Sequence, residues 1–348
     1  MKTTANRYAQ WRKWAENVWY KDPFIGVCLM PLGFIFSDIA RFRKYLYRMG
    51  VLKTQRLPVP VIVVGNITVG GTGKTPLIIW MAQLLKASGY KPGIISRGYG
   101  GQADVWPQSV TADSPAEIVG DEALLLARQS ACPVVVGPLR VEAARQLLRE
   151  ADCTIILSDD GLQHYALHRD IEIAVVDGER RFGNGYCLPA GPLREPISRL
   201  QTVDLIIVNG EIYEDNEYAM QLVGDTAVNM LSAERKPLAE FAAGECHALA
   251  GIGNPQRFFN KLASAGLACK TRSFPDHYKF QAGDILFSDS KPVLMTEKDA
   301  VKCAGFAGAQ HWYVPVAAVP EPKFAEQLLA LIKKKARCAV RTLPAHTP

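Results

Sequence analysis

The chain has 348 residues, of which 48% are hydrophobic and 21% charged, and its formal net charge is +6. This length predicts about two domains with sizeable cores, and the composition is that of an ordinary soluble globular protein. Residues 1–56 hold eleven Lys or Arg against three Asp or Glu, so this segment carries +8 and the rest of the chain −2. Such a local excess argues against a nucleic-acid-binding surface spread over the fold.

The eight cysteines lie far apart in the sequence. They form no CxxC pair and no His/Cys cluster at the spacing of metal ligands. We therefore expect reduced, mostly structural thiols in a cytosolic setting.

Residues 1–56 are expected to be a helical segment. Trp11, Trp14, Val18 and Trp19 fall on one helical face, and an uncharged run of 13 residues follows at 24–36. That run is too short to cross a bilayer with confidence, and the preceding region does not fit a signal peptide. Two alternatives remain: a helix in the bilayer interface, or a helical hairpin packed on the core. Tryptophans beside basic residues favour the interface, with anionic lipid as the partner.

The stretch VIVVGNITVGGTGKTPL, residues 61–77, predicts a phosphate-binding loop. A short buried strand precedes a glycine-rich turn, and a helix should then run to about residue 86. Glycine turns let backbone N–H groups surround phosphate oxygens, and the helix N-terminus adds a favourable field. Thr68 departs from the strict GxxxxGK[ST] pattern, which has glycine there. The candidate nucleotide-binding residues are Thr68, Gly70, Gly71, Thr72, Gly73, Lys74 and Thr75. Lys74 would contact the terminal phosphates and the Thr75 hydroxyl would hold Mg²⁺.

Strands and helices alternate along the rest of the chain, which predicts a doubly wound, mostly parallel α/β sheet. Strands are expected at 92–96, 133–137, 154–158, 171–177 and 203–209, with helices at 120–129 and 139–151. A Gly-, Pro- and Arg-rich stretch at 178–198 suggests an ordered active-site loop. We expect a kinase-like core at 57–210 and a smaller α/β unit at 211–336, with strands at 247–250, 292–296 and 312–315 and helices at 255–265 and 321–335. Residues 337–348 are expected to be a tail.

Several polar residues outside the loop are candidates for chemistry. Asp159 and Asp160 end an apolar strand, as in a Walker-B site for Mg²⁺, although a surface turn is the alternative. Asp121 begins a helix and is either a first-turn acid or a base facing a substrate hydroxyl. His277 lies in a turn, where a structural role is more common. Lys298 follows a strand end, where a helix N-cap with solvated charges is the simpler interpretation.

Together these segments resemble the tetraacyldisaccharide 4′-kinase family of lipid A biosynthesis. The motifs that carry the resemblance are GNITVGGTGKTP (65–76), SRGYGG (96–101), GDEALLLA (120–127), SDDGLQH (158–164), LPAGPLRE (188–195), GIGNP (251–255), FPDHY (274–278) and TEKDAVK (296–302). The resemblance implies transfer of the γ-phosphate of ATP, with Mg²⁺, to the 4′-hydroxyl of a tetraacyldisaccharide 1-phosphate. It also implies a peripheral or monotopic enzyme on the cytoplasmic face of the bacterial inner membrane.

The resemblance also implies roles for individual residues. Lys74 and Thr75 would serve ATP and Mg²⁺, and Asp159, Asp160 and Glu195 would lie at the metal. Asp121 would be the base and His277 would orient it. The residues expected to line the substrate site are Arg97, Tyr99, Arg140, Gln163, His164 and Lys298.

Three other functions share some of these features. A membrane-associated P-loop GTPase should carry an NKxD-type motif, which Asn209-Gly210-Glu211 lacks. A soluble ATP-dependent ligase would not explain the Trp- and Arg-rich N-terminus. A non-catalytic nucleotide-binding scaffold would not need candidate metal acids and a base. The oligomeric state cannot be inferred from the sequence.

Overall fold

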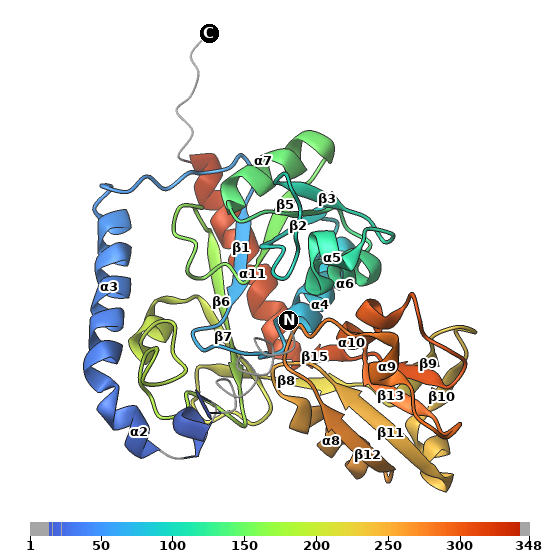
Figure 1. The fold of residues 1–348 in the computed structure, drawn as a ribbon. Helices are drawn as coiled ribbons and strands as arrows, with labels where there is room; N and C mark the ends of the chain where they lie inside the picture. Colours follow the sequence, from blue (N-terminus) through green and yellow to red (C-terminus); the bar gives the residue numbers. More distant parts are fainter. Residues whose placement is uncertain (1–13, 16, 22, 342–348) are drawn as a thin grey trace.

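The computed structural model describes residues 14–15, 17–21 and 23–341, and these form two units built on separate sheets (Figure 1). The larger unit holds a nine-stranded sheet in the order β15-β8-β7-β6-β1-β5-β2-β4-β3. The smaller unit holds a six-stranded sheet in the order β10-β9-β14-β13-β11-β12. The described part of the chain is therefore an α/β protein of two units, as the sequence predicted.

The large sheet is parallel except at its two edges. Its strands are β1 (Val61–Gly65), β2 (Pro92–Ser96), β3 (Gln108–Val110), β4 (Val134–Val136), β5 (Ile155–Asp159), β6 (Ile171–Asp177), β7 (Leu205–Asn209), β8 (Glu217–Val223) and β15 (Ala317–Pro320). Only β3 and β15 run antiparallel to their neighbours. The central strand β1 is buried along its whole length between β5 and β6, which explains why its sequence is continuously apolar.

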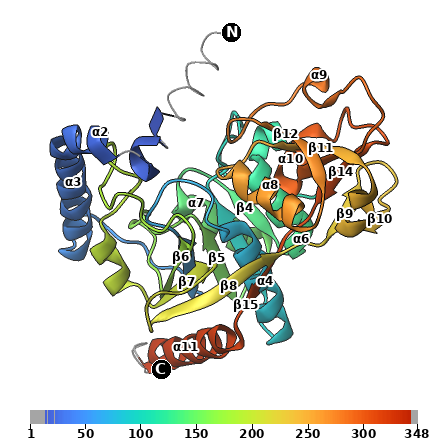
Figure 2. The same ribbon diagram turned by 90° about the horizontal axis from the view of Figure 1, so that it is seen from below.

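Helices cover both faces of the large sheet. The helices α4 (Lys74–Ala87), α6 (Asp121–Ser130) and α11 (Pro322–Arg341) pack on one face, which Figure 2 shows from below. The helix α7 (Arg140–Glu150) and the loop before η1 (Ile197–Thr202) pack on the other face. The short helix α5 (Ala116–Val119) precedes α6. This arrangement confirms the predicted doubly wound fold.

The small unit is inserted between two strands of the large sheet. Its elements are β9 (Thr226–Asn229), β10 (Arg235–Pro237), η2 (Leu238–Ala243), β11 (Glu245–Ala250), α8 (Pro255–Ser264), β12 (Ala268–Ser273), α9 (Ala282–Ile285), β13 (Val293–Thr296), α10 (Glu297–Cys303) and β14 (His311–Val314). The predicted boundaries differ from this topology. Both β8 and α11 belong to the large unit, because Phe324, Leu328 and Ile332 complete its core. Moreover, α11 continues to Arg341 through part of the expected tail.

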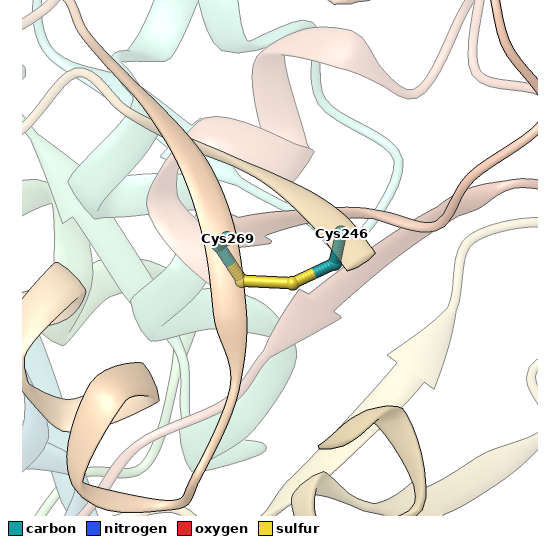
Figure 3. Close-up of a disulfide and its surroundings, with 2 residues drawn as sticks. All are labelled: Cys246 and Cys269. Carbon is teal, nitrogen blue, oxygen red and sulfur yellow. A yellow bond between two sulfur atoms is a disulfide. The ribbon is translucent and has the colours of Figure 1, made fainter. Parts of the chain in front are cut away.

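One pair of cysteines is bonded, contrary to the expectation of reduced thiols. Cys246 on β11 and Cys269 on β12 form a disulfide (Figure 3). The two residues are direct partners in the parallel ladder, with Cα atoms 4.5 Å apart. Their separation of 23 residues in sequence concealed this proximity, because a crossover through α8 joins the two strands.

The N-terminal segment combines a packed part with an exposed part. Val18 and Trp19 are buried, and the Trp19 indole donates a hydrogen bond to the Pro189 carbonyl at 3.0 Å. The expected tryptophan face is therefore divided: Trp19 belongs to the core, Trp14 is 42% exposed, and Trp11 lies outside the described residues. The helices α2 (Pro23–Cys28) and α3 (Met30–Arg48) follow along one side of the large unit (Figure 1). Among the described helices, none combines the length and apolar character that a membrane crossing requires.

Candidate active site

The P-loop connects β1 to α4 at the carboxyl edge of the large sheet. Gly70 and Gly73 adopt positive φ angles of 108° and 98°, which favour glycine, and α4 begins directly at Lys74. Thr68 and Thr72 are buried, so the hydroxyl residue at position 68 is part of the loop's packing. The structure thus brings the predicted nucleotide-binding residues into one turn at a helix N-terminus, the geometry that binds phosphate.

The Lys74 amine lies among oxygen atoms at the base of this turn. Its Nζ donates to Asn66 Oδ1 at 3.2 Å and lies 3.6 Å from Asp160 Oδ1. Arg194 forms a second ion pair with Asp160, with Nη1 2.8 Å from Oδ2. Burial alone would raise the pKa of Asp160, but these two cations lower it well below its usual range. Asp160 therefore stays ionised and holds both cations beside the P-loop.

Asp159 has a different environment from its neighbour. It ends β5 and is almost completely buried, with Oδ2 accepting a hydrogen bond from the Ser96 hydroxyl at 3.0 Å. Burial and the nearby Glu122 raise its pKa to about 6. Its other oxygen, Oδ1, has no hydrogen-bond partner within the described part of the chain. A buried carboxylate oxygen without a donor is suited to a cation.

The residues Asp121 and His277 meet across the two units. Asp121 begins α6 in the large unit, whereas His277 follows β12 in the small unit, and His277 Nδ1 lies 3.1 Å from Asp121 Oδ1. The Tyr99 ring packs against the imidazole in a tilted arrangement, with ring centroids 4.6 Å apart and an angle of 59° between the ring planes. Burial would raise the pKa of Asp121, but the hydrogen bond from His277 and the ammonium groups of Lys298 and Lys302 lower it to about 2. Asp121 is consequently an ionised, buried carboxylate.

Lys298 is part of this cluster and is not a solvated charge. Its Nζ contacts Glu122 Oε1 at 2.7 Å, Asp276 Oδ1 at 3.2 Å and His277 Nε2 at 3.3 Å. Burial would lower the pKa of Lys298, but Glu122, Asp276 and Asp121 raise it above its ordinary value. The N-cap interpretation holds for Thr296, whose hydroxyl accepts a hydrogen bond from Asp299 N at 3.2 Å.

A pocket of about 440 Å³ lies between α3 and the P-loop side of the large sheet. Its lining includes Phe36, Ile39 and Arg43 from α3, and Arg97, Asp160, Gln163, His164, Arg194 and Glu195 from the core. Burial and the nearby Arg140 and Arg97 lower the pKa of His164 to about 4, so that its ring is neutral at neutral pH. The pocket thus combines an apolar wall with several cationic side chains.

Three predicted substrate residues lie outside this pocket lining: Tyr99, Arg140 and Lys298. Lys298 contacts Glu122. Tyr99 packs on His277. The Arg140 guanidinium is buried, and it donates to the carbonyls of Gly137 and Asp159 at 2.9 and 3.1 Å. Arg140 therefore fixes the end of β5 through the backbone.

The predicted metal set is not assembled as one cluster. Glu195 Oε2 accepts a hydrogen bond from Gln163 at 2.9 Å, Oε1 accepts one from the Tyr165 hydroxyl, and Arg199 Nε lies 3.7 Å away. In the part of the chain that the structure describes, no three Asp, Glu, His or Cys residues gather as cation ligands. The side chains that fit Mg²⁺ are Thr75 at the P-loop and Asp159 with its unpaired oxygen.

Sequence reasoning did not single out three residues that the structure places at the site. Asn66 holds the Lys74 amine, Arg194 pairs with Asp160, and Glu122 pairs with Lys298. Each lies in a motif that was noted, within two residues of one that was chosen. The partners of Arg194 and Glu122 are distant in sequence, and the partner of Asn66 lies across the P-loop turn, so the motifs alone do not indicate these contacts.

Comparison with known proteins identifies the family. A family profile described as Tetraacyldisaccharide-1-P 4′-kinase matches residues 25–333. The chain belongs to this family. A tetraacyldisaccharide 4′-kinase from Nitrosococcus oceani is 52% identical over 92% of this chain and 94% of its own length. One from Pseudomonas aeruginosa is 47% identical over 88% of this chain and 93% of its own length. A crystal structure described as the "apo" form of LpxK from Aquifex aeolicus in complex with ATP has a TM-score of 0.76 and 28% identity, covering 89% of this chain and all of that one.

Membership of the tetraacyldisaccharide 4′-kinase family confirms the function that the motifs predicted. The chain is a kinase that acts on a tetraacyldisaccharide in lipid A biosynthesis. The GTPase, ligase and scaffold alternatives are thereby excluded, because relatives named as this kinase match nearly the full chain.

Proposed function

We propose that ATP and the sugar hydroxyl meet between the P-loop and the Asp121–His277 pair. The observation that carries this proposal is the convergence of four polar groups from different parts of the chain. Lys74 begins α4, Asp159 ends β5, Asp121 begins α6, and His277 comes from the small unit. Phosphoryl transfer needs charge neutralisation and positioning more than covalent help, and this arrangement provides both.

The donor side of the reaction is assigned to the P-loop. Backbone N–H groups of residues 70–75 surround the phosphates of ATP, and Lys74 moves from Asn66 and Asp160 to the terminal phosphates. Thr75 and Asp159 would hold Mg²⁺, which when bound would neutralise the developing charge. The ATP complex of the related LpxK and the unpaired Asp159 Oδ1 support this assignment.

The acceptor side of the reaction is assigned to Asp121. Because its pKa is near 2, the carboxylate is ionised at any physiological pH and can accept a hydrogen bond from the 4′-hydroxyl. His277 holds the carboxylate by one oxygen, Oδ1. The other oxygen, Oδ2, has no hydrogen-bond partner in the described chain and lies 4.0 and 3.9 Å from the Nζ atoms of Lys298 and Lys302. We assign Oδ2 to the proton of the sugar hydroxyl.

The outer face of α2 and α3 is assigned to the bilayer surface. Large apolar side chains on it are exposed to solvent, including Phe24 at 76%, Ile35 at 57% and Phe42 at 61%. On the inner face, a Cβ at Gly33 would lie 3.0 Å from Ala190 Cβ and from the Cys187 carbonyl, so glycine permits close docking on the loop. The exposed apolar area, with Arg41 and Arg48 beside it, fits an interfacial helix on anionic lipid at the cytoplasmic face of the inner membrane.

The direct test of this function is transfer of label from γ-labelled ATP. Purified protein is incubated with Mg²⁺ and a tetraacyldisaccharide 1-phosphate in mixed micelles, and the lipid product is identified by mass and by the position of the new phosphate. We expect a single 4′-phosphorylated product that requires Mg²⁺. Transfer to water alone, or to a different hydroxyl, would contradict the proposed acceptor geometry.

A further inference from the structure

The carbonyl side of the P-loop is held by Asn209, a residue with no assigned role. Asn209 ends β7, is buried, and its side-chain amide donates to the Thr72 carbonyl at 3.2 Å. The fit is close, because a Cβ added at Gly73 would lie 3.0 Å from Asn209 Nδ2. Asn209 therefore orients the peptide that precedes the last glycine of the loop.

Asn209 is in turn bound to the small unit through Arg257. Arg257 lies in the first turn of α8, and its Nη2 lies 3.0 Å from Asp177 Oδ1 and 3.4 Å from the Asn209 carbonyl. Asp177 ends the neighbouring strand β6 and is buried, with Oδ2 lacking a hydrogen-bond partner in the described residues. One guanidinium thus ties α8 to the ends of two strands beside the P-loop.

A second contact returns from α8 to the loop itself. Asn254 caps α8 by accepting a hydrogen bond from Arg257 N at 3.3 Å, and Gly253 directly precedes this cap. A Cβ at Gly253 would lie 2.6 Å from Gly71 N, so the backbone of the small unit packs directly on the P-loop. The contacts form a closed ring: P-loop to Asn209, Asn209 to Arg257, Arg257 to Asn254, and Gly253, the residue before Asn254, to the P-loop.

We propose that Asn209 and Arg257 are positioning residues that pre-organise the P-loop for ATP by connecting it to the small unit. With both present, the N–H groups of Gly71 to Gly73 are held between β7 and Gly253 before the nucleotide arrives. Without either, the loop has to be ordered at the cost of part of the binding free energy, so ATP binds more weakly. The inference rests on the proposed binding of ATP at this loop.

The test compares Asn209→Ala and Arg257→Ala with the unchanged protein. The Kd for ATP is measured by calorimetry on the full chain, and KM for ATP and for the lipid are measured separately. Losing one hydrogen bond of this kind is expected to weaken ATP binding about fivefold, or about tenfold where the charged Arg257 is lost. The KM for the lipid should change less than twofold. Because both residues belong to one ring, the Kd for ATP of the double variant should be at most about twofold higher than that of the weaker-binding single variant.

Lys261 provides a matched control. It lies one turn further along α8 and donates to the Leu222 carbonyl at 3.4 Å, so it also ties this helix to the large unit but makes no contact with the ring. Lys261→Ala should leave the Kd for ATP unchanged. If it weakens ATP binding as much as Arg257→Ala does, general docking of α8 is the cause and the proposal is wrong.

A conservative series keeps the proposal testable if Arg257→Ala is unstable. Arg257→Lys retains a cation for Asp177 and should recover part of the ATP affinity. Asn209→Asp replaces the N–H donor with an oxygen that faces the Thr72 carbonyl, so this variant should bind ATP at least as weakly as Asn209→Ala. Equal ATP affinity in the unchanged protein and Asn209→Ala, with unchanged Tm, overturns the inference. Absence of ATP binding in the unchanged protein would instead overturn the proposed function.

Discussion

Breaking the contact between Asp121 and His277 tests whether the two units build one catalytic group. In His277→Ala, Asp121 loses a hydrogen bond that spans 3.1 Å inside a mostly buried site. A hydrogen bond to a charged group contributes about 1.5–3 kcal/mol, and each 1.36 kcal/mol is tenfold in rate, so kcat should fall about 10- to 100-fold. Removing the proposed base in Asp121→Asn should cost about 10²- to 10⁴-fold.

The two substitutions should not be additive. If His277 acts only through the carboxylate, kcat of the double variant should be at most about threefold lower than kcat of Asp121→Asn. The assay is single-turnover transfer from labelled ATP to the lipid acceptor at saturating ATP, with the Kd for ATP measured in parallel as a control for the P-loop. Rate losses that multiply in the double variant would show independent roles and refute the pairing.

Three further outcomes are expected. Lys74→Ala should reduce transfer about 10²-fold or more without lowering Tm, because it removes a phosphate contact and leaves the core intact; normal turnover would rule out the P-loop assignment. Because the pKa of Asp159 is about 6, Mg²⁺-dependent ATP binding should weaken as pH falls through 6. Asp159→Asn should raise Tm at pH 8, because the substitution removes a buried charge. If Asp159→Asn raises Tm only below pH 6, this reasoning is wrong. Ile35→Glu with Phe42→Glu should abolish sedimentation with anionic vesicles but spare activity on a short-chain acceptor, because neither residue lines the pocket beside the P-loop, whereas Trp19→Ala should lower Tm; vesicle binding that survives the two glutamates would assign α3 a different partner.

The sequence was most informative where local chemistry decides the structure. The continuous apolar run of β1, the glycines with positive φ and the lysine that begins α4 were all predictable, because each reflects a local backbone requirement. The pair Asp121 and His277 was found through the family resemblance; without it, each residue had a simpler structural interpretation.

The errors arose where distant segments determine the environment of a residue. The sequence did not indicate that Tyr165 and Gln163 donate to the oxygens of Glu195, whose role as a metal ligand stays a prediction. Trp19 resembled an interfacial anchor, but the loop near Pro189 covers it. The partners of these residues are brought to them only by the tertiary fold, and local periodicity carries no record of them.

The insertion of the small unit between β8 and β15 has a consequence for biosynthesis. The two strands are antiparallel neighbours, with Val223 paired to Ala317, so the chain leaves and re-enters the large sheet at almost the same point. Side chains of α11 complete one face of that sheet, yet the ribosome makes them last. A nascent chain therefore carries an uncovered apolar surface until the intervening segment of about 90 residues has emerged and folded. Truncation before Pro322 would leave that surface permanently open, so this enzyme should not tolerate loss of α11.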